Sequence, residues 1–202
     1  KELEEINFPV VCIDGDLENK NVGHVSIDNK EAFYEMTKYL ISRCPEDKKT
    51  LNFIFMSGRK DTIAGYQRYS GFEKAIKESG REIVSELCYG DYSEKKSYEI
   101  TSSFMKRGIP IDGIVCANDM MAIGASKAIL ENGLSIPEDI QISGCDNISL
   151  SHYTYPSIST IAVDKYHIGF KAVELVNYII NKGKKERAII IPHEIVVRES
   201  TR

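Results

Sequence analysis

The stretch IDGIVCANDMMAIGASKAILENGLSIPEDIQISGCDN, residues 111–147, decides the fold class of this chain. Two short apolar runs of strand length, at 112–117 and 139–145, enclose a longer segment with helical periodicity. Either Asn118 or Asp119 is a good N-cap for that helix. A strand, a helix and a second strand in this order indicate a parallel β-sheet with a helix crossing over it.

The same alternation continues outward from this stretch. Further strand-like runs are PVVCI (9–13), LNFIFM (51–56) and EIVSELCY (82–89). Helical periodicity predicts helices over about 28–43, 64–79, 93–106 and 164–181. We therefore expect an α/β fold with parallel sheets covered by helices.

The region after residue 147 has a different pattern. Residues 149–156 are predicted to form a polar, aromatic loop and 157–163 an extended segment. The helix that follows is expected to bury one apolar stripe, made of Ile168, Val173, Val176 and Ile180.

Composition limits the functional classes. With 202 residues, 42% of them hydrophobic and 28% charged, the chain is long enough for one or two real cores. Twenty-six basic against 30 acidic residues give a net charge of −4, which lacks the basic footprint of a nucleic-acid-binding domain. No apolar run reaches the length of a membrane span, and no secretion signal is visible at the first residues. The five cysteines are odd in number and lie in apolar runs, which is typical of buried thiols in a reducing cytosol.

Polar residues follow the predicted strands at the point where each one ends. In open parallel sheets, ligands bind beyond the carboxyl ends of the strands. Arg68 falls one to two turns into the helix after the 51–56 strand. Carboxylates, an amide, a guanidinium and an aromatic ring suit a small polyhydroxy ligand, which needs donors, acceptors and a flat apolar face. The strand-end positions are Asp14, Ser57, Gly58, Asp91, Tyr92, Asn118, Asp119, Asp146 and Asn147.

Catalytic and cofactor motifs are absent from the sequence, so an enzyme, a metal site and a bound cofactor are not expected. There is no G-x-S-x-G, H-E-x-x-H, G-x-x-x-x-G-K-[ST], C-x-x-C or G-x-G-x-x-G motif. The four histidines have no metal-ligand spacing. The cysteines are expected to be buried, with a partly exposed Cys145 beside the ligand as the one alternative.

Several motifs together carry a family resemblance. The 111–147 block, followed by YPSISTIAVD (155–164), resembles the effector-binding region of the LacI/GalR family of bacterial transcription regulators. The elements RxxGFxxAI (68–76), GDYS (90–93) and PHEIVVREST (192–201) fit the same pattern in the same order. The resemblance implies the type I periplasmic binding protein fold, with two Rossmann-like parallel-sheet subdomains joined by three crossing segments.

The resemblance also implies how the chain is divided. Residues 1–25 and 163–190 would form the N-terminal subdomain, which is expected to be incomplete because the chain starts about two β/α units into it. Residues 26–162 and 191–202 would form the C-terminal subdomain. The crossing segments near 25–27, 161–163 and 190–192 would act as hinges. The DNA-binding helix-turn-helix is expected to lie outside this chain.

Five residues match positions that contact the effector in this family: Asp14, Arg68, Tyr92, Asn118 and Asp146. The resemblance implies that the guanidinium of Arg68 forks to ligand hydroxyls or a carboxylate, that Tyr92 stacks on the ligand, and that Asn118 and Asp146 bond hydroxyls. Simpler roles stay open. Asn118 and Asp119 would also serve as helix caps, Tyr92 as a cover for the sheet end, and Asp14 as a turn residue.

The function implied by the resemblance is that of a cytoplasmic sensor without enzymatic activity. A sugar-like effector would bind between the subdomains and control DNA binding allosterically through a separate head, in a homodimer with no membrane contact. The alternative is a sugar-binding receptor of a transport system with the same fold. The sequence leaves open the identity of the effector, the choice between inducer and corepressor, and a partner protein as co-effector.

Overall fold

The computed structural model describes residues 8–15, 22–182 and 188–202, and within them the chain divides into two units. Unit 1 comprises residues 1–29 and 163–193, and unit 2 comprises residues 30–162 and 194–202. The chain therefore passes from one unit to the other three times, close to the segments named above as hinges. The role of these segments as hinges stays a prediction.

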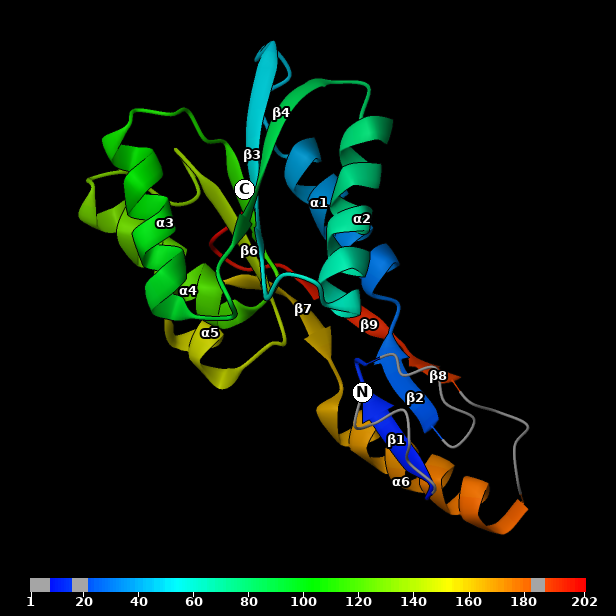
Figure 1. The fold of residues 1–202 in the computed structure, drawn as a ribbon. Helices are drawn as coiled ribbons and strands as arrows, with labels where there is room; N and C mark the ends of the chain where they lie inside the picture. Colours follow the sequence, from blue (N-terminus) through cyan, green and yellow to red (C-terminus); the bar gives the residue numbers. More distant parts are fainter. Residues whose placement is uncertain (1–7, 16–21, 183–187) are drawn as a thin grey trace. The chain divides into compact units, whose positions relative to one another are not determined.

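Unit 2 is built on a six-stranded sheet with the strand order β4-β3-β5-β6-β7-β9 (Figure 1). The five strands from β4 to β7 pair in parallel. The parallel sheet predicted from the alternation of apolar runs and helices is thus confirmed. Its strands are β3 (Thr50–Ser57), β4 (Glu82–Tyr89), β5 (Gly113–Cys116), β6 (Gln141–Cys145), β7 (Ser159–Val163) and β9 (His193–Val196).

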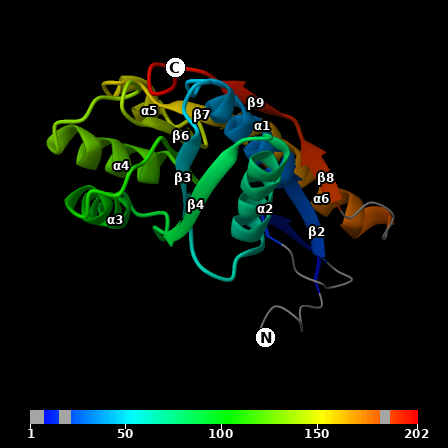
Figure 2. The same ribbon diagram turned by 90° about the horizontal axis from the view of Figure 1, so that it is seen from above.

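Helices cover both faces of this sheet. Two of them, α1 (Asn29–Ser42) and α2 (Ile63–Glu78), lie on one face. The other face carries α3 (Glu94–Lys106) and α4 (Asp119–Glu131), as two perpendicular views show (Figures 1 and 2). Because both faces are covered, the central strands β5 and β6 are buried along their whole length.

Aromatic packing fills the layer between β3 and the helices α1 and α2. Phe55 of β3 is fully buried, and its ring centroid lies 5.8 Å from that of Phe33, 5.5 Å from that of Tyr69 and 5.2 Å from that of Phe72. Aromatic rings at these separations add to the stabilisation that burial already provides. Helices α1 and α2 are thereby fixed against the sheet whose strand ends form the candidate site.

Polar side chains cap the N-termini of α3 and α4, and the cap at Asn118 is one that the sequence predicted. Asn118 caps α4 by accepting the backbone N–H of Met121 at 3.0 Å, and Ser93 caps α3 by accepting that of Lys96 at 3.2 Å. Gly80, Gly108 and Gly133, which follow the C-termini of α2, α3 and α4, all have positive φ angles.

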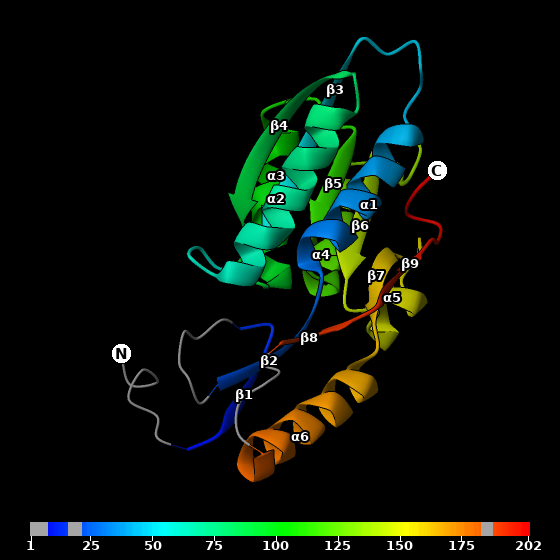
Figure 3. The same ribbon diagram turned by 90° about the vertical axis from the view of Figure 1, so that its right-hand side faces the viewer.

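Unit 1 contains a three-stranded parallel sheet with one helix against it. Its strands are β1 (Val10–Ile13), β2 (Val22–Ile27) and β8 (Ala188–Ile191), in the order β1-β2-β8. Helix α6 (Lys165–Lys182) packs along these strands (Figure 3). The approach is close, because a Cβ atom at Gly23 of β2 would lie 2.7 Å from Cδ2 of Leu175.

The apolar stripe predicted for this helix is wrong in part. Ile168 is buried as expected, but Val173 and Ile180 are each 60% exposed. Leu175 and Ile179 take their places against the sheet. Residues 168, 175 and 179 lie on one helical face, whereas Val173 and Ile180 lie on a second apolar face. Periodicity alone does not say which of two apolar faces the sheet covers.

The loop predicted over 149–156 contains a short helix, α5 (Ser149–Tyr153). The Ser151 hydroxyl and the Ser151 backbone N–H both donate to the carbonyl of Ile148, at 2.7 and 3.1 Å. A local hydroxyl bond of this kind stabilises a single helical turn that apolar periodicity does not reveal.

Gly124 and Gly169 provide a matched test of the helix packing. A Cβ atom at Gly124 of α4 would lie 2.1 Å from the carbonyl oxygen of Glu94, whereas one at Gly169 of α6 would meet nothing within 4 Å. We expect Gly124→Ala to lower the free energy of unfolding by about 1–3 kcal/mol because α3 and α4 must move apart. Gly169→Ala should be neutral or stabilise by up to ~1 kcal/mol through helix propensity.

Urea unfolding followed by circular dichroism measures both substitutions. Equal effects of the two alanines would contradict the close packing of α3 on α4.

Candidate functional site

Four of the five predicted ligand-binding residues lie at the carboxyl ends of the unit 2 strands or on the adjoining helix. Tyr92 follows β4, Asn118 follows β5 and Asp146 follows β6, while Arg68 lies on α2 after β3. Parallel strands bring these ends to one edge of the sheet. The fifth residue, Asp14, belongs to unit 1.

Arg68 is a buried cation close to the end of β5. The residue is only 5% exposed, and its Nη1 donates to the carbonyl oxygen of Ala117 at 2.7 Å. The guanidinium carbon lies 5.5 Å from the ring centroid of Phe33. Ala117 immediately precedes Asn118, so this hydrogen bond ties Arg68 of α2 to the connection that carries Asn118.

Tyr92 lies against the end of the neighbouring strand. A Cβ atom at Gly58 would be 2.0 Å from Cζ of the Tyr92 ring, so the ring packs directly on that glycine. The residue is partly exposed and has a φ of 58°. The structure therefore shows the ring covering the end of β3, and stacking of Tyr92 on a ligand stays a prediction.

Left-handed backbone is concentrated at the strand ends. Asp14 has a φ of 52°, Asp91 of 54° and Asp146 of 102°, in addition to Tyr92. Non-glycine residues rarely adopt such angles, which cost free energy and gather at sites where function requires them. Three of the five residues implied by the family resemblance are in this group.

Asn118 and Asp14 each make a local bond as well. The side-chain oxygen of Asn118 caps α4, as the simpler interpretation predicted, which leaves its amide group as a donor. The backbone N–H of Asp14 donates to the carbonyl of Val25 at 3.1 Å, and the residue is exposed. Neither local bond removes the polar group that a ligand would use.

Asp119 is the residue whose importance the sequence analysis underestimated. The sequence analysis considered it as a strand-end polar residue and as a helix cap, but it is fully buried at the start of α4. Thr160 donates its hydroxyl to Oδ1 at 2.6 Å, and the backbone N–H of Ile148 donates to Oδ2 at 2.8 Å. Burial raises the pKa of Asp119 to about 6, and the bonds from Thr160 and Ile148 oppose that rise.

Arg198 is a second residue that the sequence analysis did not single out. Its Nη2 donates to the side-chain oxygen of Asn147 at 2.6 Å, and its Nη1 donates to the carbonyl of Ile158 at 2.8 Å. The C-terminal segment thus supports the turn after β6. The signal available in the sequence was the RES motif near the C-terminus, within the block that carries the family resemblance.

The cysteines do not contribute reactive groups to this edge of the sheet. Cys44, Cys116 and Cys145 are buried, Cys12 and Cys88 are partly buried, and none forms a disulfide. The alternative of a partly exposed Cys145 is wrong, because its residue exposure is 0%. Burial raises the pKa of Cys88 to about 11 and that of Cys116 still further.

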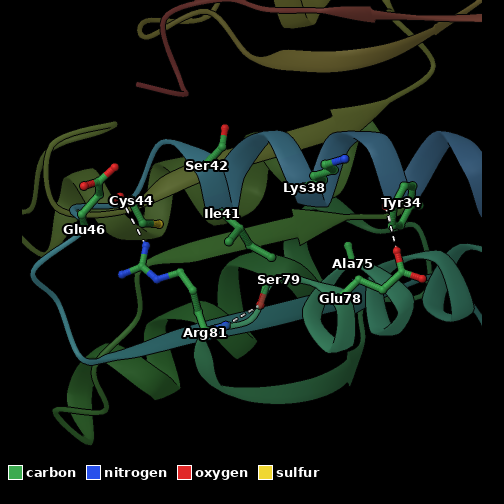
Figure 4. Close-up of a pocket in the computed structure, with 10 residues that line it drawn as sticks. All are labelled: Tyr34, Lys38, Ile41, Ser42, Cys44, Glu46, Ala75, Glu78, Ser79 and Arg81. Atoms are coloured by element: carbon green, nitrogen blue, oxygen red, sulfur yellow. Dashed lines mark hydrogen bonds between the residues drawn. The ribbon is translucent and has the colours of Figure 1, made fainter.

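Two hollows of unit 2 differ in their relation to the strand ends. One of about 160 Å³ lies beside the ends of β3 and β4 and is lined by Ser57 and Tyr89 among others. The larger, of about 450 Å³, lies between α1 and α2 and contains none of the predicted ligand residues (Figure 4).

The polar side chains that line the larger hollow form hydrogen bonds within unit 2. The Tyr34 hydroxyl donates to Glu78 at 2.8 Å, and the Ser79 hydroxyl donates to the carbonyl of Ile76 at 2.7 Å. Arg81 closes one end by donating to the carbonyl of Pro45 at 2.7 Å. These groups hold the helix ends and the following loop together, so the strand ends remain the candidate site.

In residues 8–15, 22–182 and 188–202, no group of three His, Cys, Asp or Glu side chains is placed to hold a metal ion. Across the same part of the chain, no helix combines the length and apolarity that crossing a bilayer requires.

This chain is similar in sequence to a known domain family and to transcriptional repressors. The family described as "Periplasmic binding protein-like domain" matches residues 25–201. The HTH-type transcriptional repressor PurR of Pasteurella multocida is 34% identical over 198 residues, which are 97% of this chain and 58% of that protein. The ribose operon repressor of Halalkalibacterium halodurans is 30% identical over 204 residues, covering 100% of this chain and 59% of that protein.

A solved structure shows the same fold. The LacI family transcriptional regulator from Enterococcus faecium with bound ribose superposes with a TM-score of 0.82 at 24% identity, over 96% of this chain and 70% of that one. This chain thus spans less than two thirds of the length of the curated relatives it matches.

The raised pKa of Asp119 predicts a pH dependence of stability. Between about pH 4 and pH 6 the folded chain keeps a proton that the unfolded chain releases, because the ordinary pKa of the group is 3.8. The free energy of unfolding contributed by this group therefore falls as the pH rises through that range, by about 2–3 kcal/mol in total. The loss is complete about one pH unit above the raised pKa, near pH 7.

Urea unfolding at pH 4, 5, 6 and 7 measures this dependence in the wild type and in Asp119→Asn, which cannot titrate. The exposed Asp47 supplies the control substitution Asp47→Asn. The difference between wild type and Asp119→Asn should change by about 2–3 kcal/mol across the range, with Asp47→Asn parallel to the wild type. Parallel profiles for all three proteins would contradict the raised pKa.

Proposed function

Since this chain belongs to the periplasmic binding protein-like domain family, in the form found in LacI-family transcriptional regulators, we propose that it senses a small polar metabolite for such a regulator. The proposed ligand is a sugar or a sugar derivative. The proposal assigns no catalytic step to the chain. It places the protein in the bacterial cytoplasm.

The observation that carries the proposal is the set of polar groups at one sheet edge. Arg68, Tyr92, Asn118 and Asp146 come from four successive β/α connections, and Tyr92 and Asp146 have left-handed backbone. The set combines a guanidinium, an aromatic ring, an amide and a carboxylate. Hydroxyls along a sugar ring require both donors and acceptors, and the apolar face of the ring requires a flat partner.

Each residue has a role in the proposal. Arg68 donates to ligand oxygens, Asn118 donates through its amide nitrogen, and Asp146 accepts from hydroxyls. The ring of Tyr92 stacks on the ligand. Asp14 of unit 1 is proposed to add a second carboxylate.

Such a ligand would act by changing the relative stability of two arrangements of the units. A ligand biases an equilibrium only by its difference in affinity for the two states, and coupling of this kind is typically about 1–3 kcal/mol. In this proposal a separate helix-turn-helix head binds DNA. A homodimer of the regulator transmits the ligand-induced change from the units to that head. Support comes from the relatives, which are named HTH-type or operon repressors and are longer than this chain.

The transport receptor with the same fold is the less supported function. The curated relatives reported above are named as repressors. The five thiols form no disulfide, which is typical of proteins in reducing compartments.

A thermal-shift screen of the chain tests the ligand class. Pentoses, hexoses, sugar phosphates and nucleobases are added separately, and one class is expected to raise the Tm. A ligand at 100 times its Kd stabilises the folded state by about 2.7 kcal/mol. An unchanged Tm with every compound would contradict the proposal.

Arg68→Lys tests the site within unit 2. Lysine keeps the positive charge but loses the planar fork, so the affinity for the compound found in the screen should fall ten- to a hundredfold. Arg107→Lys, on the exposed end of α3, is the control and should bind like the wild type. Calorimetric titration gives both affinities, and an unchanged affinity in Arg68→Lys would remove Arg68 from the site.

A further inference from the structure

Asp119 connects the start of α4 with two other parts of unit 2. Its two carboxylate oxygens face different elements, because Oδ1 accepts from the hydroxyl of Thr160 on β7 and Oδ2 accepts from the backbone N–H of Ile148. The distances are 2.6 and 2.8 Å, and the residue is fully buried. A buried carboxylate with both oxygens engaged is fixed in position.

These bonds converge on the segment that follows Asp146. The backbone N–H of Asn147 donates to the hydroxyl oxygen of Thr160 at 3.3 Å, and the next N–H along the chain, that of Ile148, donates to Asp119. On the other side, the backbone N–H of Asp146 donates to the carbonyl of Ile161 at 2.9 Å. Three successive backbone N–H groups are thus held by α4 and β7.

The conformation of this segment needs such support. Asp146 has a φ of 102° and Asn147 a φ of 46°. Two consecutive left-handed residues are unfavourable for side chains with a Cβ atom, and they persist only where the surrounding structure determines them. Asp119 and Thr160 supply that constraint from within the protein.

Gly144 of β6 provides the space for the carboxylate. A Cβ atom at this position would lie 2.3 Å from Oδ1 of Asp119. The glycine two residues before Asp146 therefore lets the side chain of Asp119 approach β6 closely enough to reach the segment beyond it.

We propose that Asp119 is the positioning residue of the effector site, holding the backbone of residues 146–148 so that the Asp146 carboxylate points to the ligand. This inference rests on the proposed function, which gives Asp146 its role in binding. Asp119 does not itself contact the ligand in this account. It acts through two acceptor oxygens, and an amide in its place would keep only one of them.

The electrostatic environment of Asp119 agrees with this role. Burial and the nearby Asp146 both raise its pKa, while the bonds from Thr160, Ile148 and Ser151 lower it. Burial disfavours the charged form of this carboxyl group. A role in holding the neighbouring segment in place would account for a carboxylate at this buried position.

The first measurement follows the backbone itself. Amide hydrogen exchange, read by NMR on the 202-residue chain, is compared for wild type, Asp119→Ala and Thr160→Val. The N–H groups of Asn147 and Ile148 should exchange at least tenfold faster in Asp119→Ala. Thr160→Val, which keeps the side-chain shape, should accelerate Asn147. The amide of Ile142, which donates to the carbonyl of Ser200, serves as the internal reference.

The second measurement is the affinity for the sugar or other compound selected by the thermal-shift screen. Asp119→Ala and Thr160→Val should each bind at least tenfold more weakly, and Asp119→Asn should lie between Asp119→Ala and wild type. Ile129 is buried in α4, so Ile129→Val removes a methyl group from the core contacts of the same helix. The substitution changes none of the hydrogen bonds to residues 146–148. This control should bind like the wild type, although its Tm falls.

The outcomes separate the inference from the proposed function. Unchanged exchange at Asn147 and Ile148 in both variants would overturn the inference. Faster exchange with unchanged affinity would also overturn it, because the segment would then be held without serving the ligand. An equal loss of affinity in Ile129→Val would reduce Asp119 to a general structural role. If the wild type binds no compound in the screen, the proposed function fails, and the exchange data still decide whether Asp119 holds the segment.

Discussion

Burial of the central strands on both faces is the constraint on which the rest of unit 2 depends. β5 and β6 lie between two helical layers and are buried along their length, so their own side chains are enclosed by the core and cannot reach a ligand in solvent. Polar groups for a ligand must therefore come after the strands, in the β/α connections. Parallel pairing then places those connections at a common edge, which is where Tyr92, Asn118 and Asp146 lie.

Two glycines let side chains approach the backbone closely at this edge of the sheet. Gly58 makes room for the ring of Tyr92, and Gly144 makes room for the carboxylate of Asp119. Both glycines lie at or beside strand ends, and each accepts a side chain that comes from a different β/α connection. The polar groups are thus fixed by packing from neighbouring elements, which is the kind of preorganisation that reduces the cost of binding a small ligand.

The parts of this structure that the sequence predicted depend on local signals. The capping of α4 by Asn118 follows from residues within one turn of each other, and the parallel sheet follows from the alternation of strand and helix patterns. The bonds of Asp119 join residues 29 and 41 positions apart, and those of Arg198 reach 51 positions back. Such contacts leave no periodic signal in a single sequence. The second apolar face of α6 shows the same limit, because Val173 and Leu175 are equally apolar and only the position of the sheet distinguishes them.

A crystal structure of the chain with the compound that raises its Tm tests the central claim most directly. The account predicts ligand density beyond the carboxyl ends of β3 to β6, with oxygens of the ligand within 2.7–3.2 Å of Arg68, Asn118 and Asp146 and a ring face on Tyr92. Density confined to the hollow between α1 and α2, or anywhere else away from these four residues, would contradict it.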